Sequence, residues 1–185
     1  MGVAYLVFIL VAAERLTELV LARRNTRALL AQGAVEIGRG QYPWFVVLHA
    51  GWLAALAATV PAAAPPDWAW LGLFALLQLG RAWVIASLGR FWTTRMITLP
   101  GAPLIRRGPY RFVRHPNYLV VALEIPVLPL AFGAVWIALV FGLANLALLA
   151  WRIAIEDRAL AARRDAPPGD EPFERAHRGA VVEDR

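Results

Sequence analysis

The residues most capable of chemistry lie in one fifteen-residue stretch, 104–118, which reads LIRRGPYRFVRHPNY. It combines four arginines with two tyrosines, one histidine and one asparagine, whereas most of the chain consists of Ala, Leu, Val, Phe and Trp. Arginines bind anions, and tyrosine rings stack on flat bases or face cations. The stretch is therefore a candidate site for a ligand with an anionic group and a flat or cationic part.

The His115-Pro116 pair predicts the start of a helix. Proline suits the first turn, and it biases His115 away from helical backbone angles. This places His115 beside the backbone N–H groups of Asn117 and Tyr118, which we expect to be free and to attract an anion. A basic linker that anchors to lipid headgroups explains the same residues without chemistry, and both interpretations stay open at this point.

A second candidate group follows in the segment 151–158, which reads WRIAIEDR. Arg152 and Glu156 are four residues apart, so they share a helix face. Arginine before glutamate is the less favourable order for an ion pair within a helix, which favours the two groups facing something else. With no Cys, three His and no HxxxH or HExxH spacing, no metal site and no cysteine nucleophile is predicted.

The elements that must position these groups are apolar. The chain has 185 residues, which is one domain's length, with 59% hydrophobic and only 17% charged residues. That composition is typical of an integral membrane protein. The net charge of +6 comes from arginines that lie between apolar runs, so membrane topology explains it better than nucleic-acid binding does.

Five apolar segments predict an all-α integral membrane protein with five transmembrane helices. They lie at about residues 3–22, 43–60, 68–88, 117–132 and 134–150. A bilayer core requires about 20 residues, with about 17 as the lower limit, so the last two are short. Only Gly133 separates those two, which predicts a tight helical hairpin whose first arm is kinked by Pro126 and Pro129.

The arginines predict how this bundle is oriented. Seventeen of the nineteen fall in residues 23–39, 90–114 and 152–185, and five spans place all three groups on one side. The opposite side receives the N-terminus, the PAAAPPD loop and the Gly133 turn, which hold no basic side chain. The positive-inside rule then places the N-terminus outside and the C-terminus in the cytoplasm. We expect a cytoplasmic connector, a C-terminal helix and a loosely ordered tail at 165–185.

Two further arginines, Arg15 and Arg81, lie within spans or at their cytoplasmic ends. Glu14 and Glu18 are four residues apart and share a face of the first span. Charged groups inside a membrane are costly and normally pair with one another. We therefore expect Arg81 to reach one of these glutamates, the alternative being that all four side chains extend to the membrane interface.

The sequence GPYRFVRHPNY, a helical hairpin and then RIAIEDRAL together resemble the isoprenylcysteine carboxyl methyltransferase family of integral membrane enzymes. The resemblance covers about residues 90–160, the catalytic half of a single domain. The first half, with GAVEIGRGQYP, resembles a bacterial branch often associated with type III polyketide synthases. It implies S-adenosylmethionine (SAM) at the cytoplasmic face and a lipophilic acceptor that enters from the bilayer.

The resemblance also assigns site residues. The family's cofactor contacts fall on Ala102, Pro103, Leu104, Ile105, Tyr110, His115, Pro116, Asn117, Tyr118 and Glu156. The family's substrate-side arginine falls on Arg152, so Arg152 and Glu156 are the catalytic candidates. These assignments suit SAM, because a helix start, tyrosines and a carboxylate match its carboxylate, adenine and sulfonium. Arg152 would hold an acceptor oxyanion.

The function expected from this resemblance is in-line O-methyl transfer in a bacterial inner membrane. The acceptor would be an alkylpyrone or alkylresorcinol hydroxyl from a polyketide synthase pathway, or an isoprenylcysteine-type carboxylate. Three alternatives remain: an NADPH-dependent membrane lipid or sterol reductase, a phospholipid N-methyltransferase, and a non-catalytic lipid-binding protein. The first and second share a related half with the RHPxY pattern, and the third predicts no SAM binding.

Overall fold

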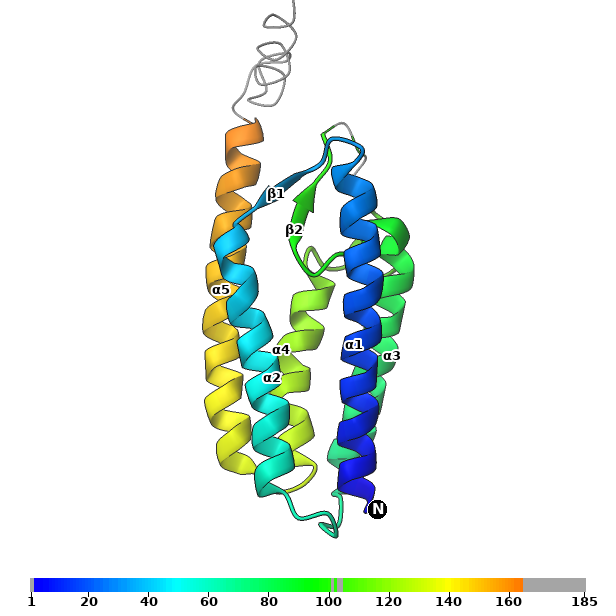
Figure 1. Cartoon of the computed structure of the whole chain (residues 1–185), viewed down its shortest axis with the longest axis vertical. Coiled ribbons are helices and arrows are strands. Elements are labelled where there is room, and N and C mark those ends of the chain that lie inside the picture. The colour runs from blue at the N-terminus through cyan, green and yellow to red at the C-terminus, as the bar shows by residue number, and fades with distance from the viewer. Residues whose placement is uncertain (1, 101, 103–104, 165–185) are drawn as a thin grey trace, which may run out of the picture.

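The computed structural model describes residues 2–100, 102 and 105–164, with the backbone alone for 159–164. The predicted tail at 165–185 and the predicted cofactor contacts Pro103 and Leu104 lie outside the described residues. Within these limits the fold is a bundle of five α-helices (Figure 1). They are α1 (Val3–Leu30), α2 (Tyr42–Thr59), α3 (Trp68–Leu88), α4 (Pro116–Leu130) and α5 (Val135–Arg164).

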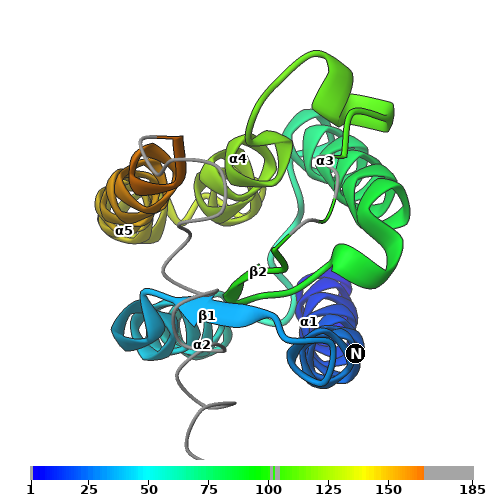
Figure 2. The same ribbon diagram turned by 90° about the horizontal axis from the view of Figure 1, so that it is seen from above.

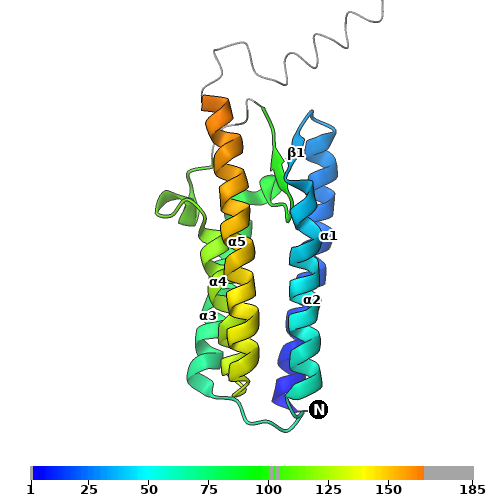
Figure 3. The ribbon, with the colours of Figure 1, turned by 90° about the vertical axis from the view of Figure 1, so that its left-hand side faces the viewer.

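The helices run alternately up and down the bundle (Figure 1). The N-terminus, the 60–67 segment and the 131–134 turn lie at one end, and the arginine-bearing connections lie at the other. Seen from above, α1 and α2 form one row and α3, α4 and α5 form a second row (Figure 2). The side view in Figure 3 shows the same two layers. Segments far apart in the sequence thus meet at the arginine-bearing end.

The helix boundaries follow local signals in the sequence. Asp67 caps α3, because its side chain accepts hydrogen bonds from the backbone N–H groups of Ala69 (2.9 Å) and Trp70 (3.3 Å). Helix α4 begins at Pro116, as the sequence predicts. Helices α1 and α5 extend well beyond the predicted spans, which end at residues 22 and 150. Their polar, arginine-rich ends continue the helix because nothing in them breaks it.

The prediction of an all-α fold is confirmed, and the connections add a short pair of strands that the sequence did not predict. A three-residue strand β1 (Val35–Ile37) pairs antiparallel with a second strand, β2 (Met96–Thr98). The pairing joins the α1–α2 connection to the α3–α4 connection. Three short 3-10 turns complete the same end of the bundle: η1 (Arg39–Gln41), η2 (Gly89–Phe91) and η3 (Gly108–Arg111). Together these pieces form the cap that positions the candidate site.

The surface of the bundle is apolar as well as its core. Trp52 is buried and donates from its indole N–H to the Ile125 carbonyl (3.0 Å), which ties α2 to α4. Large apolar side chains such as Leu79 (68% exposed) and Trp136 (79% exposed) face outward. In the described part of the chain, three helical segments are long and apolar enough to cross a membrane. They are Arg39–Thr59, Trp68–Phe91 and Val135–Arg158.

The membrane-crossing evidence is thus strongest for α2, α3 and α5. Helix α4 is apolar but shorter, and α1 is not among the three spanning segments. Crossing by α1 and α4, and with it the five-span count and the transmembrane hairpin, stays a prediction. Pro126 and Pro129 both lie inside α4, as expected for its first arm.

A buried cluster of charges joins α1, α3 and α4. Arg81 donates through two guanidinium nitrogens to Glu18 at 2.5 and 2.6 Å, which confirms the predicted pairing. Arg81 also donates to Glu124 of α4 (3.1 Å), and Arg15 binds Glu18 (3.1 Å) and Glu124 (3.3 Å). Gln78 donates to Glu14. Because Arg81 and Glu18 are buried, extension to the interface is excluded for these two of the four side chains.

Candidate functional site

The candidate site lies at the capped end of the bundle, where α4 begins and α5 passes it. Arg152 and Glu156 lie on the face of α5 that meets α4, and both contact Tyr118 in the first turn of α4. Arg152 donates to the Tyr118 hydroxyl (3.0 Å), and that hydroxyl donates to Glu156 (2.8 Å). The phenol therefore bridges the two charged groups. As their order in the sequence predicts, both face a third group.

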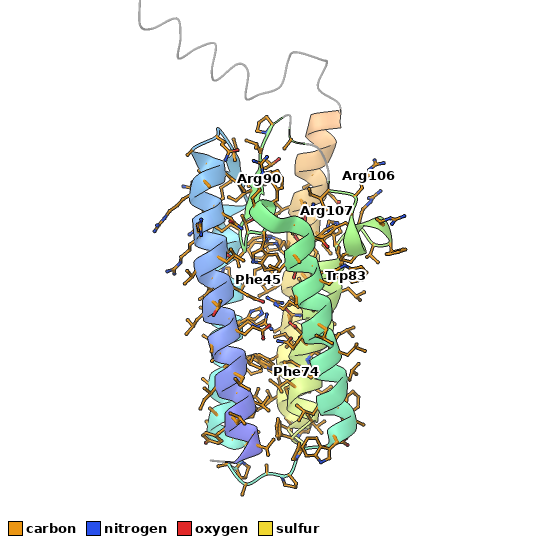
Figure 4. The ribbon with its side chains drawn as sticks, turned by 90° about the vertical axis from the view of Figure 1, so that its right-hand side faces the viewer. Phe45, Phe74, Trp83, Arg90, Arg106 and Arg107 are labelled. Carbon is orange, nitrogen blue, oxygen red and sulfur yellow. The ribbon has the colours of Figure 1, made fainter. Side chains whose placement is uncertain are left out.

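Arg152 is buried without an acidic partner. Its side chain also donates to the Thr94 carbonyl (3.1 Å), and its guanidinium carbon lies 5.2 Å from the centre of the Phe45 ring. Figure 4 shows Phe45 inside the bundle, near the capped end. Among the described residues, no carboxylate lies within ion-pair distance of Arg152. A buried cation without a counter-charge is unfavourable, so Arg152 is suited to bind an anion.

His115 lies beside Tyr118 and Glu156. Its ring stacks on the Tyr118 ring, with centroids 5.0 Å apart and planes 9° apart, and its Nδ1 lies 3.8 Å from Glu156. The side chain of Glu156 is 30% exposed, so a ligand can reach the carboxylate. This group offers a negative charge next to stacked rings, which suits a flat ligand that carries a positive charge.

The expectation of free backbone N–H groups at this helix start is wrong for Tyr118. The backbone N–H of Tyr118 donates to the His115 carbonyl (3.0 Å), so it is not free to bind an anion. The geometry of the first turn explains this, because His115 adopts the capping position and its carbonyl accepts the first bonds of α4. Pro116 is buried. The side-chain oxygen of Asn117 is also buried and has no hydrogen-bond partner among the described residues.

Tyr110 belongs to the edge of the same group. It packs against the buried cluster of Ala22, Val84 and Trp92. Burial raises the pKa of the Tyr110 phenol, and the Tyr118 hydroxyl and then the Glu156 carboxylate raise it further. The phenol therefore stays neutral through the physiological range and keeps its hydroxyl proton for donation.

The other predicted contacts lie in the connector before η3. Ala102 and Ile105 are half-buried, and the backbone N–H of Ala102 donates to the Leu99 carbonyl (3.2 Å). The structure gives neither of them a contact with Arg152 or Glu156. Their cofactor role therefore stays a prediction, as it does for Pro103 and Leu104.

The arginines of the same stretch do not line the site. Arg106, Arg111 and Arg114 are exposed, and Arg107 donates to the Ser87 carbonyl at the end of α3 (2.8 Å). Figure 4 shows Arg106 and Arg107 on the outer side of the bundle, and η3 projects beside α3 in Figures 2 and 3. The lipid-anchor and ligand-site interpretations of residues 104–118 therefore apply to different residues. The arginines fit a membrane interface, and the histidine and tyrosines fit a site.

Gly108 allows η3 to dock on α3. Its φ of +58° is a left-handed conformation, and a Cβ there would lie 2.0 Å from the Ser87 hydroxyl oxygen. Any other residue would therefore push η3 away from α3. The docked turn fixes the point from which the chain reaches His115 and enters α4.

Sequence reasoning missed two residues that contact Arg152. Phe45 comes from the first turn of α2, and Thr94 contributes only a backbone carbonyl from the connector. Neither carries a recognisable signal, because their importance arises from the packing of α2 and β2 against α5. Among the described residues, no cluster of His, Cys, Asp and Glu could hold a metal ion.

Comparison with known proteins identifies the family of this chain. Residues 70–162 match the model of the isoprenylcysteine carboxyl methyltransferase (ICMT) family. The uncharacterized protein YpbQ of Bacillus subtilis is 37% identical over 161 residues, covering 84% of this chain and 95% of that protein. An uncharacterized protein of Haemophilus influenzae is 29% identical over 160 residues, covering 83% and 92%. No solved structure gives a significant match.

Proposed function

Because this chain belongs to the isoprenylcysteine carboxyl methyltransferase family of membrane methyltransferases, we propose that it transfers a methyl group from SAM to an oxygen of a lipophilic acceptor. The helices that are long and apolar enough to span a membrane agree with that family. The acceptor oxygen is anionic when it reacts, and Arg152 holds it.

The observation that carries this proposal is the environment of Arg152. Its hydrogen-bond partners are the Tyr118 hydroxyl and the Thr94 carbonyl, and the Phe45 ring lies beside it. All of these groups are uncharged. An ionised acceptor oxygen would supply a counter-charge in direct contact with Arg152, and the guanidinium would lower the acceptor's pKa in return. Arg152 would thus favour the reactive, ionised form and orient it.

The residues opposite Arg152 fit the cofactor. SAM supplies the methyl group when it is bound. Glu156 offers a partly exposed carboxylate for a positive charge or for hydroxyl donors, and the stacked His115 and Tyr118 rings offer a flat surface. Tyr118 donates to Glu156 and accepts from Arg152, so one side chain orients both halves of the site.

This arrangement needs little acid–base chemistry. An acceptor that is already ionised would need no protein group to remove its proton, and SAM, when bound, would supply both the methyl group and a sulfonium leaving group. The residues then contribute by alignment and by exclusion of water, which supply large rate gains in displacement reactions.

We also propose that all five helices cross the bacterial inner membrane, with the N-terminus outside and the site at the cytoplasmic face. The described arginines outside α1 and α3 lie at the capped end, as the positive-inside rule requires for that orientation. The acceptor enters from the bilayer. Alkylpyrone or alkylresorcinol hydroxyls and isoprenylcysteine-type carboxylates all combine an acidic oxygen with an apolar chain.

Calorimetric titration of SAM and its demethylated product into detergent-purified protein tests the cofactor assignment. We expect micromolar binding to the wild type and binding weakened at least about tenfold, or 1.4 kcal/mol, in Glu156→Ala. Asp157→Ala is the matched control, because Asp157 is the exposed neighbour on the same helix. A well-folded wild type that binds NADPH and not SAM would replace this proposal with the reductase alternative.

A further inference from the structure

The side-chain amide of Gln41 is buried and makes no hydrogen bond within the described structure. It is the last residue of η1, directly before α2, and it is 2% exposed. Neither its side-chain oxygen nor its side-chain nitrogen has a partner within the described structure. A buried amide left unpaired is unfavourable, and native proteins keep very few of them. Such a group is suited to a ligand that completes its hydrogen bonds.

Gln41 differs in this from the other buried side chains with unpaired atoms. Asn145 has an unpaired oxygen, but its nitrogen donates to the Val121 carbonyl (3.2 Å). Trp92 has a single unpaired N–H. Of the described side chains, Gln41 leaves both a donor and an acceptor unused.

The Gln41 amide lies on the Arg152 side of the site. A Cβ placed on Gly38 would lie 3.6 Å from the Gln41 oxygen and 3.2 Å from Ile155 of α5, so these two groups are close. One helical turn further along α2, Phe45 lies beside Arg152. Ile155 and Arg152 are three residues apart and share a face of α5. Gln41, directly before α2, and Phe45, in its first turn, thus both lie near the face of α5 that carries Arg152 and Ile155.

We infer that Gln41 binds a second polar oxygen of the methyl acceptor, next to the oxygen held by Arg152. The inference rests on the proposed function, because it concerns the acceptor of that reaction. The amide donates to this second oxygen and, where the oxygen is a hydroxyl, accepts from it. Gln41 is therefore a determinant of acceptor specificity.

This arrangement selects between the proposed acceptor classes. A carboxylate has both oxygens on one carbon, so a single guanidinium can bind both at once and leave Gln41 unpaired. A ring with two separated oxygens, as in a resorcinol or a hydroxypyrone, can serve Arg152 with one and Gln41 with the other. The unpaired amide therefore favours an alkylated ring with two oxygens over an isoprenylcysteine-type carboxylate.

Methyl transfer to two matched acceptors tests the inference. The probes are a 5-alkylresorcinol and the 3-alkylphenol of the same chain length, assayed with labelled SAM and the full chain in detergent. Wild type should prefer the resorcinol by about tenfold or more in kcat/KM, because a site built to bind a hydroxyl discriminates against its absence. In Gln41→Leu that preference should fall to about twofold or less, through a higher KM for the resorcinol alone.

Three controls keep the result specific. Gln32→Leu changes an exposed glutamine in the turn after α1 and should keep the preference. SAM affinity should be the same in Gln41→Leu, and thermal stability should be equal or higher because an unpaired polar group is removed. Gln41→Met provides a second variant of similar volume that should behave in the same way.

Several outcomes would overturn the inference. An unchanged preference in Gln41→Leu shows that the amide does not contact the acceptor. Loss of SAM affinity in Gln41→Leu shows that it contacts the cofactor instead. If wild type binds SAM but methylates neither ring, the acceptor class is wrong while the cofactor assignment stands. If wild type does not bind SAM, the proposed function itself fails.

Discussion

Two buried arginines of this protein have opposite surroundings. Arg81 is 5% exposed and faces the carboxylates of Glu18 and Glu124. Arg152 is 9% exposed and faces a phenol, a backbone carbonyl and an aromatic ring. The first charge is balanced by the fold alone. The second has no carboxylate in direct contact within the described chain, because Glu156 reaches it only through the Tyr118 hydroxyl, and this suits a residue that binds an anionic ligand.

The two regions also differ in what they hold together. The Arg81 cluster joins α1, in one row of the bundle, to α3 and α4 in the other (Figure 2). The Arg152 group lies at the capped end, at the first turn of α4, about two helical turns from Glu124. In the proposed function, stability and ligand binding would thus depend on different arginines. This separation allows each region to be changed without the other.

The largest effect is expected from Arg81→Met. The substitution leaves Glu18 and Glu124 buried beside Arg15 alone, and removal of one partner from a buried ion pair costs about 3–5 kcal/mol. Denaturant unfolding in detergent, followed by tryptophan fluorescence, measures the change. The double variant Arg81→Met with Glu18→Met should recover part of the loss. If Arg81→Met unfolds at the wild-type midpoint, the cluster is not what stabilises the bundle.

Arg152→Met should have the opposite effect, with a large loss of activity and little loss of stability. We expect methyl transfer to fall by about 10²–10³-fold, as when a donor to a developing or bound oxyanion is removed. The free energy of unfolding should change by less than about 1 kcal/mol, because no carboxylate is left unpaired. Assays of labelled methyl transfer and denaturant unfolding on one sample measure both quantities. Arg158→Met, an exposed arginine further along α5, is the control. A loss of unfolding free energy as large as that of Arg81→Met would show that the two arginines do not have separate roles.

Glu36 provides a third case with a smaller expected effect. Its side chain is 3% exposed and binds Arg95 (3.1 Å) and Arg39 (3.1 Å), and Arg39 itself is 79% exposed. Arg39→Ala should cost less than about 1 kcal/mol, because exposed ion pairs contribute little. Arg95→Ala should cost more, since Arg95 is less exposed and makes two bonds to Glu36. Unfolding at low and high salt compares the two variants. Equal losses of unfolding free energy would show that side-chain exposure does not determine how much these ion pairs stabilise the protein.

The sequence was sufficient for the helices and for one of the two arginine sites. Long apolar runs ended by Pro, Gly or Asp mark α2 and α3 to within about one residue, because a helix boundary depends on local chemistry. The Arg81–Glu18 pair was predictable because a charge inside an apolar run needs a partner, and few were available.

The remaining features depend on tertiary packing. The strands β1 and β2 have three residues each and come from distant connections, so neither has a periodic signal of its own. Glu124 is a single acid in an apolar run, and nothing local shows that it faces Arg81. Gln41 lies in a polar connection and becomes notable only once the fold buries it. Such residues gain their roles from contacts made far along the chain.

The order of the charges along the chain has a consequence for membrane insertion. Glu14, Arg15 and Glu18 enter first, and Arg15 and Glu18 already bind each other within α1. Arg81 arrives with α3 and finds Glu18 in place, and Glu124 arrives last to meet both arginines. In the proposed five-span arrangement, each later charge would therefore enter the bilayer beside a partner of opposite sign. In that arrangement, helix α4, short and interrupted by prolines, would bring Glu124 to a place that Arg15 and Arg81 already occupy.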